Sequence, residues 1–188
     1  MSRTQPRIPY TYADYKSLPE SMDRRYELLG GELHLLPAPT IRHQRIAHRL
    51  ELAMSQYVEP TGLGEILHSP IDVVFGEGAA RDVAQPDIVF ISRERARIVT
   101  ETEIAGAPDL TVEILSPGTE ERDRNYKKSL YARHGVREYW IVDPLGNAIE
   151  VYALAEQGYA EPRTFKAPVA FESGVLPALR LDLAAVFA

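Results

Sequence analysis

A glutamate inside an apolar segment is the feature that most constrains how this chain can fold. The segment Leu110–Leu115 reads Leu-Thr-Val-Glu-Ile-Leu, and its β-branched and apolar residues predict a buried strand. Side chains of a strand alternate between faces, so Leu110, Val112 and Ile114 are expected on one face and Glu113 on the other. A carboxylate is costly to bury unless it is paired or binds a metal. The sequence therefore predicts a central strand whose glutamate has a specific partner.

The remaining composition is that of an ordinary globular protein. The chain has 188 residues, of which 45% are hydrophobic and 26% are charged, and it contains no internal repeat or linker, so we expect one domain over residues 1–188. The absence of cysteine excludes disulfides, a thiol nucleophile and cysteine–zinc sites. No apolar run approaches the roughly 18 residues of a spanning helix, and the first residues have no apolar signal core. We therefore expect a cytoplasmic protein that does not contact the membrane.

The hydrophobic pattern predicts helices on either side of several strands. Helices are expected over residues 11–17, 40–58 and 120–134, and a terminal helical turn over 181–187. Pro60 is expected to end the first long helix. Strands are expected at residues 26–29, 32–36, 65–68, 71–75, 87–91, 110–115, 136–142 and 148–154, with a glycine hairpin turn at 30–31. This order predicts an α/β sheet flanked by helices, with added hairpins.

Two further charged residues are expected close to Glu113. Asp87 opens the strand expected at residues 87–91, and if the two strands are neighbours both carboxylates can converge on a hard cation such as Mg²⁺. Lys127 shares a helical stripe with Asp123 and Tyr131, and the apolar members of this stripe indicate that it faces the sheet. Lys127 would then neutralise the carboxylates, or orient a metal-activated water for attack on a phosphate.

Each of these residues also has an ordinary structural interpretation. An aspartate after a proline, such as Asp87, is typical of a strand end, and a glutamate within a strand often faces solvent. A lysine can extend its alkyl chain over apolar surface. Asp123 and Lys127 could also form an i,i+4 ion pair on the helix surface. The joint occurrence of these charges on two strands and the following helix favours a functional site.

Two blocks of sequence resemble a known family. Pro108–Pro117, followed by Asp123, Lys127 and Tyr131, and the block Gly135–Pro144 are similar to the core signature of the Uma-two family. These are bacterial restriction-endonuclease-like proteins of the PD-(D/E)XK nuclease superfamily. Residues 26–33, 43–45 and 85–87 extend the resemblance over nearly the whole chain. The resemblance implies a restriction-endonuclease-like fold, with a central mixed β-sheet flanked by helices, extra N- and C-terminal hairpins, and a nuclease core at approximately residues 40–143.

The resemblance also implies roles for individual residues. Asp87 is similar to the metal-binding aspartate of the superfamily, and Glu113 to its second acidic ligand. The superfamily has a lysine two residues after this glutamate, whereas this chain has Leu115, so the lysine role is assigned to Lys127. Glu27 is expected to contribute a further carboxylate. The expected catalytic residues are therefore Glu27, Asp87, Glu113 and Lys127, with Asp87 and Glu113 as metal ligands.

The activity implied by the resemblance is Mg²⁺-dependent hydrolysis of DNA phosphodiester bonds, with Mn²⁺ as a substitute ion. Leu115 and the net charge of −6 keep two alternatives open: a catalytically inactive nuclease-fold module for binding or assembly, and a hydrolase of another phosphate ester. His43, on the inward face of the first long helix, either lines the site or holds local structure, and the structural role is preferred. A homodimer is expected, because cutting both strands of a duplex with one site per chain needs two copies.

Overall fold

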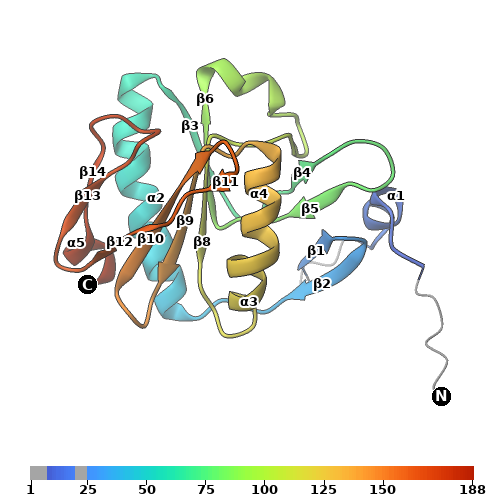
Figure 1. Ribbon diagram of the computed structural model, residues 1–188, viewed down its shortest axis with the longest axis horizontal. Coiled ribbons are helices and arrows are strands. Elements are labelled where there is room, and N and C mark those ends of the chain that lie inside the picture. Colours follow the sequence, from blue (N-terminus) through green and yellow to red (C-terminus); the bar gives the residue numbers. More distant parts are fainter. Residues whose placement is uncertain (1–7, 20–24) are drawn as a thin grey trace.

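Two β-sheets with helices packed around them make up the fold (Figure 1). The computed structural model describes residues 8–19 and 25–188. The larger sheet has the order β11-β10-β9-β8-β6-β3, with β12 paired to β10. Its strands are β3 (Gly64–His68), β6 (Ile88–Ser92), β8 (Leu110–Ile114), β9 (Glu138–Asp143), β10 (Ala148–Ala155), β11 (Gly158–Tyr159) and β12 (Arg163–Lys166). Strands β8 and β9 run parallel, whereas β6–β8 and β9–β10 are antiparallel, so the sheet is mixed, as expected.

The second sheet contains the N-terminal hairpin. Its order is β2-β1-β5-β4-β7, and its strands are β1 (Arg25–Leu29), β2 (Glu32–Leu36), β4 (Val73–Phe75), β5 (Asp82–Ala84) and β7 (Ile104–Ala105). A separate pair joins β13 (Ala170–Glu172) to β14 (Arg180–Asp182). Gly30 and Gly31 have φ angles of 58° and 78°, and a two-residue turn of this kind requires such positive angles. The predicted hairpin is therefore confirmed.

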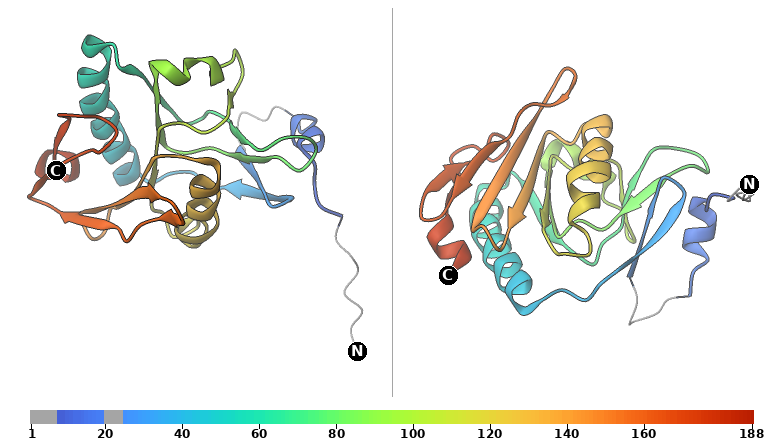
Figure 2. Two further views of the ribbon diagram at one scale, coloured as in Figure 1. Left: turned by 45° about the horizontal axis from the view of Figure 1, so that its top comes forward. Right: turned by 60° about the horizontal axis from the view of Figure 1, so that its bottom comes forward.

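Helices cover both faces of the larger sheet (Figure 2). The helical segments of the structure are α1 (Tyr12–Lys16), which packs on the smaller sheet, α2 (Ile41–Thr61), the 3₁₀ helix η1 (Arg93–Ile98), α3 (Glu120–Arg122), the π-helical segment η2 (Asp123–Lys127), α4 (Lys128–His134) and α5 (Leu183–Phe187). Segments α3, η2 and α4 follow one another without a break and replace the single α-helix expected over residues 120–134. Among the described residues, no helix is both long enough and apolar enough to cross a membrane.

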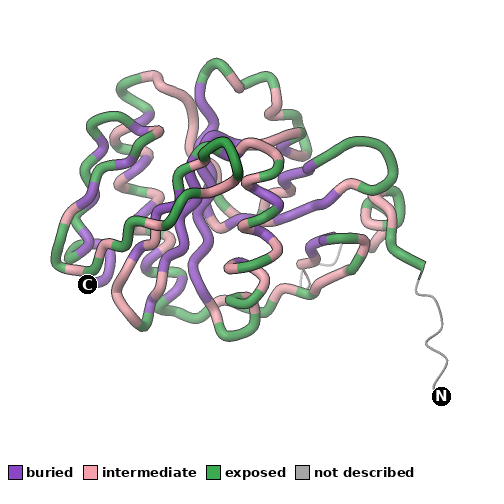
Figure 3. The backbone as a smooth tube through the Cα atoms, viewed as in Figure 1, coloured by how far each residue is buried: buried purple, intermediate pink, exposed green. Residues whose placement is uncertain are grey.

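The central strands are buried on both faces (Figure 3). On one face, Leu110, Val112 and Ile114 pack in a cluster that also contains α2 residues such as Leu50. On the other face, residues of α4 such as Tyr131 pack against side chains of β6 and β9. The alternation predicted for β8 is therefore confirmed, and it leaves Glu113 on the side of α4.

Several predicted boundaries were wrong by one to three residues, among them the end of α2 and the start of β6. Helix α2 continues through Pro60 to Thr61, because Gly62 supplies the helix end: its φ is 63° and its N–H donates to the carbonyls of Val58 and Glu59. A proline in the last turn removes only one backbone hydrogen bond, so it does not stop the helix earlier. Asp87 lies just before β6 and is not its first residue. The short strands β5, β7, β11, β13 and β14 were not predicted, because two or three residues carry too little periodic pattern.

A buried glutamate ties the larger sheet to the C-terminal segment. Glu138, at the start of β9, is only 2% exposed. Its Oε1 accepts hydrogen bonds from Trp140 Nε1 at 2.7 Å and from the Ser173 hydroxyl at 2.8 Å. Its Oε2 accepts a bond from the backbone N–H of Gly174, also at 2.8 Å. Three donors therefore depend on this one carboxylate.

Replacing Glu138 by alanine is expected to lower the free energy of unfolding by about 3 kcal/mol, because three donors lose their acceptor in a buried site. Urea denaturation of the variant and the wild type measures this change. Glu172→Ala, at an exposed position of β13, is the matched control and should change stability by less than about 0.5 kcal/mol. Equal stability of the two variants would show that Glu138 does not anchor the C-terminal segment.

Candidate active site

Three of the four predicted site residues line one cleft. The cleft has a volume of about 240 Å³ and is bordered by the first half of α2, the segment after β2, and the ends of β6 and β8. Its polar lining includes Arg25, His43, Asp87, Glu113, Thr119 and Lys127. These residues come from segments that are distant in the sequence, and they meet because β6 and β8 are neighbours in the sheet. The strands that position Asp87 and Glu113 are thus neighbours, as expected.

Asp87 is held against the end of β8. Its backbone N–H donates to the carbonyl of Val112 at 3.1 Å, and its Oδ2 accepts the backbone N–H of Ile114 at 2.7 Å. The same Oδ2 lies 3.2 Å from Nε2 of His43 on α2. None of the described residues donates a hydrogen bond to Oδ1. The backbone of Asp87 therefore has the strand-end role that was considered for this residue. One oxygen of its carboxylate has no donor among the described residues.

Glu113 is 4% exposed and also uses one carboxylate oxygen for protein contacts. Its Oε1 accepts hydrogen bonds from Nζ of Lys127 at 3.0 Å and from the hydroxyl of Tyr131 at 2.6 Å. Within the described part of the chain, no donor contacts Oε2. Burial raises the pKa of Glu113 well above 4.5, Lys127 opposes this rise, and the charges of Asp123 and Asp87 add to it.

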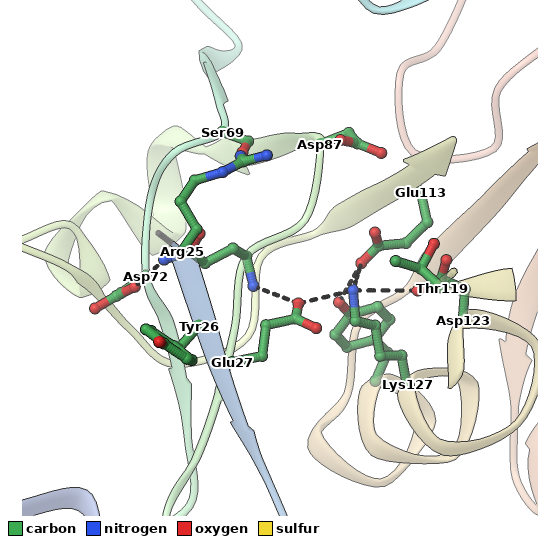
Figure 4. A network of polar contacts seen from close by, with 12 residues as sticks. Arg25, Tyr26, Glu27, Ser69, Asp72, Asp87, Glu113, Thr119, Asp123 and Lys127 are labelled. Atoms are coloured by element: carbon green, nitrogen blue, oxygen red, sulfur yellow. Dashed lines mark hydrogen bonds and ion pairs between the residues drawn. The ribbon is translucent and has the colours of Figure 1, made fainter. Parts of the chain in front are cut away.

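Lys127 lies at the centre of three carboxylates (Figure 4). Its Nζ is 2.8 Å from Oε1 of Glu27, 3.0 Å from Oε1 of Glu113 and 3.2 Å from Oδ1 of Asp123. The side chain is only 2% exposed, and the carboxylates raise the pKa of Lys127 well above 10.5 although burial acts in the opposite direction. Only the contact with Glu113 is also a hydrogen bond, and the other two carboxylates act on the ammonium through their charge. This geometry favours charge neutralisation over orientation of a water.

A π-helical segment presents this lysine to the sheet. Asp123 and Lys127 are the buried residues of η2, and their i,i+4 ion pair is confirmed. Tyr131, on the continuing helix α4, supplies the second donor to Glu113. A π-helical turn inside a helix is often found at functional sites because it changes the direction of side chains locally. The helical stripe predicted the inward face correctly, but it did not predict the π-helical geometry.

Glu27 reaches the site from the other sheet. It lies on β1 with no exposed surface, and its Oε1 accepts the backbone N–H of Gln85 at 2.9 Å in addition to the contact with Lys127. Its Oε2 is buried without a hydrogen-bond partner. Because Glu27 is not among the residues that line the cleft, it acts on the site through Lys127. Glu27, the further carboxylate expected from the N-terminal hairpin, therefore contacts Lys127 but does not line the cleft.

The two cleft carboxylates fit a magnesium ion of the kind that keeps several of its waters. Asp87 Oδ1 and Glu113 Oε2 have no described protein donor, and both residues border the cleft. In sites of this type Mg²⁺ is bound by one or two carboxylates together with waters and substrate phosphate oxygens. The described residues contain no group of three or more His, Asp or Glu side chains arranged as a metal cage. The donor set thus suits an ion shared with a phosphate substrate.

Two contacts of the site could not be found from the sequence. Tyr131 was expected as a member of the buried stripe and of the family signature, but its hydroxyl bond to Glu113 depends on how α4 packs on β8. His43 was assigned preferentially to local structure, whereas its imidazole lines the cleft and contacts Asp87. The helical periodicity of the sequence indicates that both side chains face inward. It does not indicate which side chain of the sheet each of them contacts.

The acidic cluster is expected to make stability fall as the pH rises. Burial raises the pKa of both Glu113 and Asp123 in the folded protein. A carboxyl with a raised folded pKa stabilises the fold fully below its unfolded pKa, and this contribution is lost as the pH rises through the folded pKa. Urea denaturation between about pH 5 and pH 8 should show that the free energy of unfolding decreases by an amount on the order of 1 kcal/mol or more.

The variant Glu113→Gln should flatten this pH dependence, because it removes one of the two titrating carboxyls. Glu94→Gln, at an exposed position of η1, is the control and should keep the slope of the wild type. A wild-type stability that stays constant or increases over this pH range would contradict the raised pKa values.

Comparison with known proteins places this arrangement in a family. The profile of the family Uma2, described as "Putative restriction endonuclease", matches residues 12–184. An uncharacterised protein of Synechocystis sp. is 25% identical over 146 residues, covering 77% of this chain and 74% of that protein. The crystal structure of a putative nuclease belonging to DUF820 from Anabaena variabilis superposes with a TM-score of 0.79 at 24% identity, covering 95% of this chain and 98% of that one. The fold is thus restriction-endonuclease-like, as predicted, and the chain belongs to the Uma2 family.

Proposed function

We propose that this protein is a Mg²⁺-dependent nuclease that hydrolyses DNA phosphodiester bonds and accepts Mn²⁺ as a substitute. The observation that carries the proposal is that Asp87 and Glu113, in one cleft, each have a carboxylate oxygen to which none of the described residues donates. Membership of a family described as restriction endonucleases supports the same reaction class. In the proposal, Asp87 and Glu113 hold the ion, which when bound would activate water and offset charge on the phosphate.

The other side chains of the cleft have separate tasks. Lys127 neutralises the buried carboxylates, which lowers the repulsion that an approaching phosphate meets. Arg25 donates from Nη1 to the hydroxyl of Ser69 at 2.6 Å, and no ion pair joins it to any carboxylate in the described part of the chain. Its remaining guanidinium donors therefore suit a phosphate group of the substrate.

The proposed assembly is a homodimer. One cleft per chain suits hydrolysis of one strand, so cleavage of both strands of a duplex requires two copies. The net charge of −6 predicts that DNA binding outside the cleft is weak.

One observation favours a second candidate function, a catalytically inactive nuclease-fold module. Leu115 stands where the superfamily has its lysine, and it packs into the apolar cluster beside α4. Lys127 is 2% exposed and has three carboxylates around its ammonium, so this lysine replaces the missing one in charge but has little surface for contact with water. A module of this kind would bind its partner without hydrolysing it.

Conversion of supercoiled plasmid DNA to open circles tests the two functions. The wild type should nick DNA with Mg²⁺ or Mn²⁺ and not with a chelator present. Asp87→Asn and Glu113→Gln should each reduce the initial rate by about 100-fold or more, because each removes a charged ligand from the ion. Circular dichroism confirms that the variants fold, and Glu94→Gln should retain the wild-type rate.

Two results would decide against the nuclease. If the folded wild type cuts no supercoiled, linear or single-stranded DNA with either ion, the inactive module is supported. If both acidic variants retain the wild-type rate, the hydrolysis does not occur at this cleft.

A further inference from the structure

His43 has a place in the cleft that a local structural role does not explain. It lies in the first turn of α2 and is 8% exposed, although the residues around it in this turn are exposed. Thr40 already caps the helix, because its hydroxyl oxygen accepts the backbone N–H of His43 at 3.1 Å. The imidazole is therefore not needed to begin the helix, and its ring points to the cleft instead of into an apolar cluster.

The imidazole acts on one oxygen of Asp87. Its Nε2 is 3.2 Å from Oδ2, the oxygen that also accepts the backbone N–H of Ile114 at 2.7 Å. A backbone N–H donor of β8 and an imidazole nitrogen of α2 thus converge on a single carboxylate oxygen. A carboxylate held at one oxygen by two donors has a restricted side-chain rotation. Its second oxygen, Oδ1, consequently keeps one direction relative to Glu113.

The same geometry makes His43 unsuitable as a direct ligand. The Nε2 atom is used by Asp87, and the Nδ1 atom is buried without a hydrogen-bond partner among the described residues. A metal-bound histidine needs one ring nitrogen for the ion, and the other nitrogen usually donates to an acceptor that fixes the ring. Here Nε2 contacts Asp87 and Nδ1 is buried, so neither ring nitrogen is open to an ion in the cleft.

We propose that His43 is a positioning residue for divalent cation binding: by donating from Nε2 to Oδ2 of Asp87, it holds the carboxylate so that Oδ1 is available to the ion. This inference rests on the cation site of the proposed function but not on DNA hydrolysis. Outer hydrogen-bond partners of metal ligands typically change metal affinity by about 10- to 100-fold when they are removed.

Binding of Mn²⁺ to the DNA-free protein, followed by the electron paramagnetic resonance signal of the free ion, tests the proposal. His43→Leu should weaken the affinity by about 10-fold or more, and Asp87→Asn should abolish binding at the cleft. His43→Gln, whose side-chain amide can donate to Oδ2 in place of the imidazole, should remain within about threefold of the wild type. Gln56→Leu, at an exposed position of the same helix that does not line the cleft, is the matched control and should bind Mn²⁺ as the wild type does.

Thermal unfolding checks that each variant is folded. If His43→Leu is not folded, His43→Asn replaces it, because the amide of asparagine is too short to reach Oδ2. Three results would each overturn the positioning role. His43→Leu could bind Mn²⁺ with the wild-type affinity, or His43→Leu and His43→Gln could weaken the affinity equally. The third result is a nitrogen coupling from His43 to the bound Mn²⁺. A wild type without Mn²⁺ binding would overturn both this inference and the cation site. Affinities in the expected order without any DNA cleavage would support the positioning role and reject only the nuclease function.

Discussion

The contacts of Lys127 with three carboxylates are the interaction on which the rest of the site depends. Glu27 comes from the smaller sheet, Glu113 from the larger sheet and Asp123 from the π-helical segment, so one ammonium joins three parts of the fold. All four side chains are almost fully buried. Removing one partner of a buried ion pair leaves an uncompensated charge, which costs about 3–5 kcal/mol. The lysine therefore makes it possible for acidic residues to gather beneath the cleft.

The cluster still contains more acidic groups than basic ones, and this excess links its structure to its proposed chemistry. The raised pKa values of Glu113 and Asp123 indicate that the folded protein binds protons there more tightly than the unfolded chain does. A cation that enters the cleft beside Asp87 and Glu113 would offset the same excess and would compete with those protons. The excess of acidic groups thus destabilises the folded protein when no cation is bound, and it would strengthen the binding of a divalent ion.

The position of the lysine shows how far residue patterns could predict this site. The alternation of side chains on β8 identified the face of Glu113, and the helical stripe identified the inward direction of Lys127. Because Leu115 stands where the resemblance implies a lysine, that role was assigned to Lys127 on the following helix, and its ammonium does contact Glu113. The π-helical geometry was not predictable, because the same side chains also fit an ordinary α-helix.

The sequence by itself determined the main helices and strands, their inward faces and the candidate acidic residues, because periodicity and burial preferences are local properties of the chain. Only the tertiary structure decided which of those residues meet. The contact of His43 with Asp87 requires α2 to cross the end of β6, and the contact of Glu27 with Lys127 requires the two sheets to lie side by side. The order of strands and the placement of helices depend on the packing of the whole core, and no short pattern contains that information.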